Sequence, residues 1–122
     1  YFCKVGIRVP ISEPEERRVE NRVVGADANT YLALAVQLAC GYLGIKEKLQ
    51  PSAVTTGSAY DSTYQLPREL SEALRLLDAC KPLHDVLGKR FLDVYVAVKE
   101  TEHEEFMRVI SPWEREHLLM HV

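Results

Sequence analysis

Two short segments near the start of the chain have strand character. In residues 17–24, Val19 and Val23 fall on one side, and the charged Arg18, Glu20 and Arg22 fall on the other. This period of two is typical of a β-strand. Residues 4–9 combine β-branched and basic side chains and stop at Pro10. The polar loop between the segments favours a loose antiparallel hairpin, although the pattern does not fix the pairing.

After residue 29 the apolar positions follow the 3.6-residue period of helices. The first predicted helix covers residues 30–49, with Asn29 or Asp27 as its N-cap and Pro51 behind its end. It is apolar on nearly every side as far as residue 45. We therefore expect this helix to be the buried centre of the fold.

Four further helical segments follow a polar loop over residues 52–65, in which Tyr60 and Tyr64 could line a substrate entrance. One helix opens at Pro67 and carries an apolar stripe of Leu70, Ala73, Leu74 and Leu77. The next two cover residues 82–87, ended by Gly88, and residues 90–109. The last begins at a capping box of Ser111 and Glu114, with Pro112 in first position. The predicted fold class is α+β, a short antiparallel β-hairpin followed by four to five helices.

Composition narrows the class of protein. The chain has 122 residues, and 15 Lys and Arg against 18 Asp and Glu give a net charge of −3. This length favours one domain, and the near-neutral balance argues against nucleic acid as a partner. No apolar run reaches the roughly 18 residues of a membrane span, and we expect no membrane partner. The odd, widely spaced Cys3, Cys40 and Cys80 indicate reduced thiols and a cytoplasmic protein.

The charged face of residues 17–24 is the strongest candidate for chemistry. A carboxylate between two guanidinium groups can ligate a divalent cation, while the arginines receive anionic groups. If the hairpin pairs, Arg8 joins them from the neighbouring strand, which would suit phosphoryl transfer. The alternative is a solvent-facing strand whose charges neutralise one another, and spacing alone favours that alternative.

Three sequence runs favour a site for chemistry over a solvent-facing strand. They are residues 8–10 (RVP), residues 17–22 (RRVENR) and residues 25–35 (GADANTYLALA). In order and spacing they resemble the C-terminal part of the glutamine synthetase catalytic domain, and the resemblance extends over essentially the whole chain. More narrowly, residues 25–29 and 109–119 are similar to the γ-glutamylpolyamine, or glutamate–putrescine ligase, branch of that family.

The resemblance implies an ATP-dependent carbon–nitrogen ligase that forms γ-glutamyl amides through a γ-glutamyl phosphate. Its substrates would be glutamate and an amine, either a polyamine or ammonia, and its cofactors ATP with Mg²⁺ or Mn²⁺. By position, Glu20 would be a metal ligand, and Arg8 and Arg18 would be catalytic and bind the ATP phosphates. Arg22 would hold the glutamate carboxylate. Family members assemble as homo-oligomeric rings, so a ring is expected for the complete enzyme.

The resemblance also implies that residues 1–122 form a C-terminal portion of the catalytic domain, without the N-terminal β-grasp domain and the first part of the catalytic domain. One carboxylate cannot hold two metal ions, so we expect the isolated chain to be inactive. Two residues depart from the family pattern: Thr30 stands where proline is usual, and Glu15 where bacterial members often carry a lysine near the adenine.

Other hypotheses stay open. The first is an ordinary, ammonia-using glutamine synthetase, and the second, of another class, is a non-catalytic helical interaction module. Glu114, His117 and His121 would share one face of a helix and could hold zinc, although surface histidine pairs are common.

Overall fold

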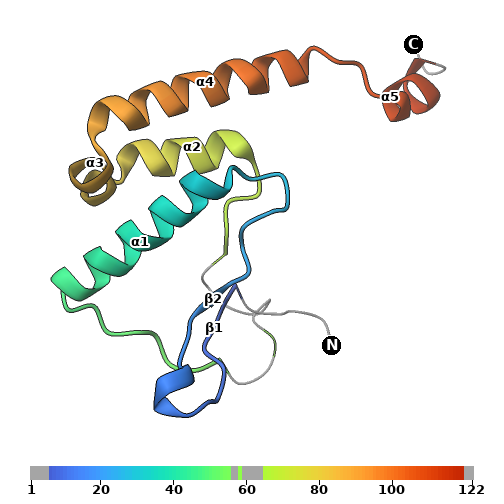
Figure 1. The fold of residues 1–122 in the computed structure, drawn as a ribbon. Helices are drawn as coiled ribbons and strands as arrows, with labels where there is room; N and C mark the ends of the chain where they lie inside the picture. Colours follow the sequence, from blue (N-terminus) through green and yellow to red (C-terminus); the bar gives the residue numbers. More distant parts are fainter. Residues whose placement is uncertain (1–5, 56–57, 59–64, 120–122) are drawn as a thin grey trace. The chain divides into compact units, whose positions relative to one another are not determined.

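The computed structural model describes residues 6–55, 58 and 65–119, which fall into two compact units, Tyr1–Leu66 and Pro67–Val122. The first unit contains a two-stranded antiparallel sheet and one long helix, and the second contains four helices (Figure 1). The predicted α+β class is therefore confirmed for the described part of the chain. Tyr60, Tyr64, Cys3 and His121 lie outside the described residues.

The hairpin forms as predicted, but its strands are short. β1 (Ile7–Arg8) pairs with β2 (Glu20–Asn21), and the register places Arg8 opposite Glu20. The Arg22 amide still donates to the Gly6 carbonyl at 2.8 Å. The next amide, that of Val23, points away from β1 in this register and donates to the Asn21 side chain at 2.9 Å. This local turn accompanies the end of β2, which stops short of the predicted boundary at residue 24.

Between the strands, the predicted loop contains one turn of 3₁₀-helix, η1 (Pro14–Glu16). Proline at the first position suits this turn because its fixed φ is already helical.

The helix α1 (Thr30–Lys46) begins at Asn29, one of the two predicted N-caps. The Asn29 side chain accepts hydrogen bonds from the amides of Tyr31 and Leu32, at 3.0 and 3.2 Å. The helix ends three residues before the predicted boundary. Lys48 has a φ of 53°, and the Leu49 amide returns to the Gly44 carbonyl at 2.9 Å. These contacts form a Schellman motif, which stops the helix without help from Pro51.

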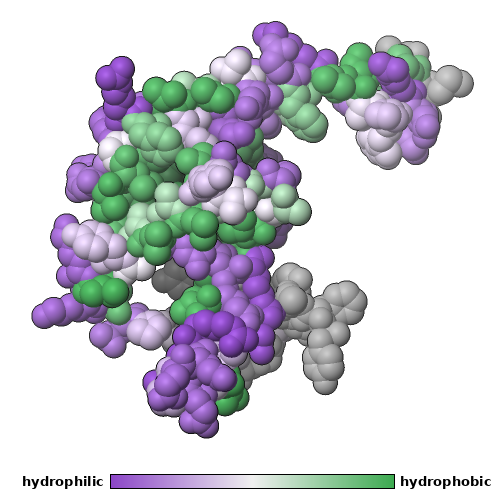
Figure 2. Space-filling model, in the orientation of Figure 1, coloured by the Kyte–Doolittle hydropathy of each residue, from purple (hydrophilic) through white to green (hydrophobic). Residues whose placement is uncertain are grey.

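The expectation that α1 is the buried centre of the fold is wrong for the described part of the chain. Ala39 is its one buried residue there, whereas Leu38 and Ile45 are 74% and 81% exposed. The physical reason is the lack of a packing partner, since neither β1 nor β2 packs against α1. Hydrophobic residues are drawn in green in Figure 2, and the exposed ones of α1 include Leu38 and Ile45.

The second unit has its own small core. α2 (Leu70–Ala79), α3 (Lys81–Leu87) and α4 (Lys89–Met107) pack on one another. Leu74 of α2 and Leu92 of α4 are the buried apolar side chains of this unit among the described residues. Gly88 separates α3 from α4 with a φ of 90°, which supports the predicted stop, because glycine adopts this conformation without steric cost.

Two boundaries in this unit differ from the prediction by more than one residue. α2 starts at Leu70 rather than Pro67, because Glu69 is extended and its carbonyl accepts the first helical hydrogen bond, from Ala73 at 3.1 Å. α4 ends two residues early, at Met107. No helix in the described residues has the length and apolar character needed to cross a membrane.

The last helix, α5 (Pro112–His117), begins with the predicted capping box. The Ser111 hydroxyl accepts from the Glu114 amide at 3.1 Å, and the Glu114 carboxylate accepts from the Ser111 amide at 2.7 Å. The hydrogen bond from the Ser111 amide is the largest cause that lowers the pKa of Glu114, and the Ser111 side chain is the second, because both stabilise the ionised carboxylate.

Candidate functional site: an arginine cluster around Glu20

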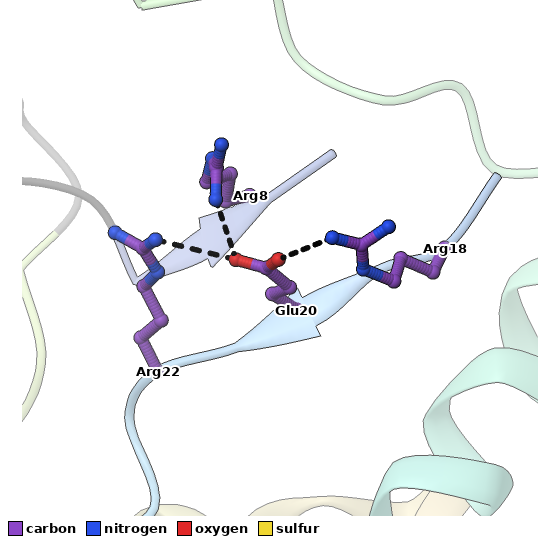
Figure 3. Close-up of polar contacts among 4 residues, drawn as sticks. All are labelled: Arg8, Arg18, Glu20 and Arg22. Carbon is purple, nitrogen blue, oxygen red and sulfur yellow. Dashed lines mark hydrogen bonds and ion pairs between the residues drawn. The ribbon is translucent and has the colours of Figure 1, made fainter. Parts of the chain in front are cut away.

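Three guanidinium groups converge on the carboxylate of Glu20, from Arg8, Arg18 and Arg22 (Figure 3). We call these four residues the Glu20 cluster. The Oε2 atom of Glu20 accepts hydrogen bonds from Arg8 at 3.0 Å and from Arg22 at 3.2 Å. Its Oε1 atom lies 3.5 Å from the nearest Arg18 nitrogen. The structure therefore brings together all four residues that the sequence singled out.

The local fold explains this convergence. The register of β1 and β2 sets Arg8 opposite Glu20, and directly paired residues project from the same face of a sheet. Arg18 and Arg22 lie two residues to either side of Glu20, so an extended backbone turns their side chains to that face as well. The pairing that the sequence left open is what adds Arg8 to the cluster.

The charge balance of the cluster favours an anionic ligand. Three guanidinium groups and one carboxylate leave a net charge of +2 (three minus one). The hydrogen bond from Arg8 is the main cause that lowers the pKa of Glu20, opposed by its partial desolvation and helped by the charge of Arg8 and by Arg22. Glu20 is therefore ionised at neutral pH and neutralises only part of the positive charge.

The guanidinium groups are accessible to a ligand to different degrees. The side chains of Arg18 and Arg8 are 59% and 47% exposed, and that of Arg22 is 28% exposed. A guanidinium has five N–H donors, so each arginine can serve Glu20 and still present a fork to a phosphate or carboxylate. The predicted alternative, a solvent-facing strand whose charges pair with one another, is also compatible with these ion pairs.

The cluster fits one ligand position of a magnesium or manganese site, but not the whole site. The Glu20 carboxylate supplies the hard oxygen atoms that these ions prefer. Among the described residues, no group of three acidic, histidine or cysteine side chains could hold a metal ion. Any further ligands would have to come from outside this set of residues.

A shallow pocket of about 360 Å³ lies beside β2 in the same unit. Its lining includes Asn21 of β2, the turn residues Gly25 and Ala26, and Thr30 and Leu34 of α1. Sequence reasoning did not assign Asn21 a role, although asparagine is unusual in a strand. In the structure Asn21 is the last residue of β2, accepts a hydrogen bond from the Val23 amide and lines this pocket. Thr30 is compatible with the helix start, since Asn29 provides the cap.

In the described residues, the two proposed zinc ligands Glu114 and His117 are engaged in other contacts. The Glu114 carboxylate is engaged in the capping box, and Nδ1 of His117 lies 3.0 Å from the Trp113 carbonyl. The His117 ring also stacks on Trp113, with ring centroids 4.8 Å apart. His121, the third member, lies outside the described residues. Cys40 is exposed and Cys80 is half-buried, and both are free cysteines.

Comparisons with known proteins show the family to which this chain belongs. The family model described as glutamine synthetase, catalytic domain, matches residues 4–118. The chain is 33% identical over 119 residues to a glutamine synthetase of Archaeoglobus fulgidus, covering 88% of this chain and 24% of that protein. It is 32% identical over 121 residues to type-1 glutamine synthetase 2 of Dictyostelium discoideum, covering 94% and 23%.

The name of a third relative states an organic amine. The chain is 32% identical over 114 residues to the glutamate–isopropylamine ligase of a Pseudomonas species, covering 90% of this chain and 25% of that protein. Two of these relatives are thus named as glutamine synthetases and one as a ligase of glutamate and an amine. The chain belongs to the glutamine synthetase catalytic-domain family. It spans about a quarter of the length of the curated relatives that it matches.

Proposed function

We propose that this chain supplies the phosphate-binding arginines of an ATP-dependent ligase that joins glutamate to an amine through a γ-glutamyl phosphate. The observation that carries the proposal is the Glu20 cluster, with its net charge of +2 and its exposed guanidinium forks. Formation and breakdown of an acyl phosphate concentrate negative charge on phosphoryl oxygens. Preorganised cationic donors stabilise such charge more in the transition state than in the ground state.

Each residue of the cluster has a proposed role. Arg8 and Arg18 contact the ATP phosphates and the transferring phosphoryl group, and Arg22 binds the substrate glutamate carboxylate. Glu20 provides one carboxylate ligand to a divalent cation, Mg²⁺ or Mn²⁺. When bound, such an ion would neutralise phosphate charge beside the arginines. The arginines suit these roles because their planar forks donate paired hydrogen bonds to carboxylate and phosphate.

We further propose that residues 1–122 act as a C-terminal portion of a glutamine synthetase-type catalytic domain. Two observations support this: the chain matches about a quarter of its relatives' length, and the described residues offer one carboxylate at the cluster. The remaining ligands would come from polypeptide equivalent to the other three quarters. In the complete enzyme the chain would form part of a homo-oligomeric ring, and alone it would be inactive.

The amine is either a polyamine or ammonia. The similarity of residues 25–29 and 109–119 to the γ-glutamylpolyamine branch favours a polyamine, whereas glutamine synthetases among the relatives favour ammonia. One relative is named as a glutamate–isopropylamine ligase, so an organic amine is named as the substrate of a related protein. We propose the polyamine-type reaction first and the ammonia-type reaction as its alternative.

A chimaeric enzyme tests the proposed function. Residues 4–118 replace the matching segment of the Archaeoglobus fulgidus glutamine synthetase, and glutamate-dependent ADP formation is measured with ammonium, with putrescine and without amine. Amine-dependent turnover supports the ligase function. A folded, assembled chimaera without turnover, beside an active parent enzyme, contradicts it. Because the amine site includes parent residues, the preferred amine is informative only as a change relative to the parent.

The exposed apolar surface of α1 favours a second candidate function, that of a helical interaction module without chemistry. Tyr31, Leu38 and Ile45 lie on one side of α1 and are largely exposed. Large exposed apolar patches mark protein interaction sites. The chimaera separates the two candidates. A module that lacks the chemistry would leave a folded chimaera without amine-dependent turnover.

A further inference from the structure

The three arginines of the Glu20 cluster are not held equally. Arg8 and Arg22 donate hydrogen bonds to Oε2 at 3.0 and 3.2 Å. The Arg18 contact with Oε1, at 3.5 Å, lies beyond the usual range of about 2.7–3.2 Å for such hydrogen bonds. Arg18 is also the most exposed of the three, at 59%. Its interaction with Glu20 is therefore a solvent-screened ion pair, the weakest class of charge contact.

The backbone contacts also separate Arg18 from Arg8 and Arg22. Arg8 belongs to β1, and the Arg22 amide donates to the Gly6 carbonyl at 2.8 Å, so the sheet fixes both residues. Arg18 precedes β2, which begins at Glu20, and has no partner in the strand register. Both its backbone and its side chain are thus freer than those of the other two arginines.

We propose that Arg18 is the exchangeable arm of the cluster: it leaves Oε1 of Glu20 to bind an incoming phosphate-type anion, while Arg8 and Arg22 stay on Oε2. Glu20 is then a positioning residue for Arg8 and Arg22 in the absence of any metal ion. Its Oε1 atom becomes open as Arg18 moves away. This inference rests on the proposed function, in which the cluster accepts phosphate groups.

The energetics favour Arg18 over its neighbours as the moving group. Releasing Arg8 or Arg22 would break a charge-assisted hydrogen bond, whereas releasing Arg18 breaks only a long ion pair. The guanidinium then gains paired hydrogen bonds to phosphate oxygens, which carry more negative charge than a carboxylate. Arg17, its neighbour, provides a matched control, because among the described residues Glu20 pairs with Arg8, Arg18 and Arg22 only.

The test follows the arginine Nε–Hε signals of the 122-residue chain by ¹⁵N NMR as inorganic pyrophosphate is added without metal. Signals are assigned with Arg8→Lys, Arg18→Lys and Arg22→Lys. We expect the Arg18 signal to shift most with pyrophosphate. Arg8, which the proposed function also places on phosphate, should shift less because it keeps its hydrogen bond to Oε2, and Arg22 should change little. Arg18→Gln should weaken binding by about tenfold, the loss of one charge-assisted contact, and Arg17→Gln by much less. Circular dichroism checks that each variant is folded.

The other outcomes are distinguishable. If Arg8 or Arg22 shifts while Arg18 stays fixed, the proposed exchange is wrong, although anion binding by the cluster stands. If Arg17→Gln and Arg18→Gln weaken pyrophosphate binding equally, the binding depends only on the overall positive charge. That result would also contradict the exchange. If no arginine signal responds to pyrophosphate, both the exchange and the phosphate-binding role of the cluster are contradicted.

Discussion

Arg8 and Glu20 lie directly opposite each other in the two-stranded sheet, and the Arg8 guanidinium donates to the Glu20 carboxylate at 3.0 Å. They are twelve residues apart in sequence and come from the two different strands. The pair links the fold to the candidate site, because the register that pairs β1 with β2 also completes the cluster. A change in that register by one residue would turn the side chains of β2 to the opposite face.

The Glu20 cluster should make stability depend on acidic pH. The pKa of Glu20 in the folded chain lies below its ordinary value of 4.5, mainly because of the Arg8 hydrogen bond. A lowered folded-state pKa means that the unfolded chain binds the proton more readily. The contribution of Glu20 is therefore present above pH 4.5 and is lost as the pH falls through the folded-state pKa.

Urea unfolding of wild type and Glu20→Gln, measured from neutral pH downward, checks this prediction. The difference in unfolding free energy between the two should shrink as the solution becomes acidic. Glu114→Gln serves as a comparison, since the pKa of Glu114 is also lowered but by the Ser111 capping contacts. A difference for Glu20→Gln that is constant across the acidic range would contradict the role of the arginine contacts.

Replacing Asn29 should weaken the start of α1. Its side chain accepts from the Tyr31 and Leu32 amides, and Asn29→Ala removes that cap. The expected cost is about 0.5–2 kcal/mol, seen as lower helix content and an earlier urea midpoint. Asn29→Ser keeps a capping oxygen and should lose far less. Equal effects of the two substitutions would mean that the cap does not stabilise α1.

Two leucine substitutions test where the core lies. Leu92 is 2% exposed in the second unit, so Leu92→Ala should destabilise that unit by about 2–5 kcal/mol. Leu38 is 74% exposed on α1, and Leu38→Ala should change stability by no more than about 0.5 kcal/mol. Chemical unfolding of both variants measures the contrast. A large loss for Leu38→Ala in the isolated chain would show that α1 is buried after all.

The exposed apolar side of α1 should make the isolated chain self-associate. Leu38 and Ile45 expose large apolar surfaces, and covering them removes apolar area from water. Light scattering should show a mass that rises with concentration, and Leu38→Glu should lower it. Glu47→Gln, which changes an exposed polar residue just beyond α1, should not. A wild-type monomer at high concentration would contradict this expectation.

Sequence patterns predicted most local structure because local contacts determine it. The Asn29 cap, the Ser111–Glu114 box and the stop at Gly88 each depend on residues close in sequence, and all three are present. Arg18, Glu20 and Arg22 could be grouped for the same reason, from the period of a strand. The addition of Arg8 needed the pairing of β1 with β2, which the periodicity did not fix.

The predictions that failed concern the burial of α1 and the ends of β2 and α1. Each depends on contacts that the hydrophobic pattern of the sequence does not contain. The apolar composition of α1 predicted burial, but burial depends on a partner that the described part of its unit does not provide. β2 stops at Asn21, whose side chain forms a local turn with the Val23 amide, and the left-handed Lys48 ends α1 early. Neither event changes the hydrophobic pattern, so periodicity could not reveal it.

The isolated chain should show no ligase activity. The described residues offer no group of three metal-ligating side chains, and Glu20 is the one carboxylate in the cluster. ATP, glutamate, magnesium and either ammonium or putrescine should yield no amide above a protein-free control. Amide formation that depends on Glu20 would contradict the proposal that residues 1–122 are one portion of a larger catalytic domain.

The most direct test of the central claim measures kcat of the chimaeric ligase with Glu20→Gln, Arg8→Gln or Arg18→Gln. Each removes a charged group that would act on the phosphates, so kcat should fall by about 100-fold or more. Glu16→Gln, in η1 of the same hairpin and outside the cluster, should leave kcat within about twofold, because surface substitutions away from a site have small effects. Full activity of the three cluster variants in folded, assembled chimaeras would contradict the claim that this cluster serves phosphoryl transfer.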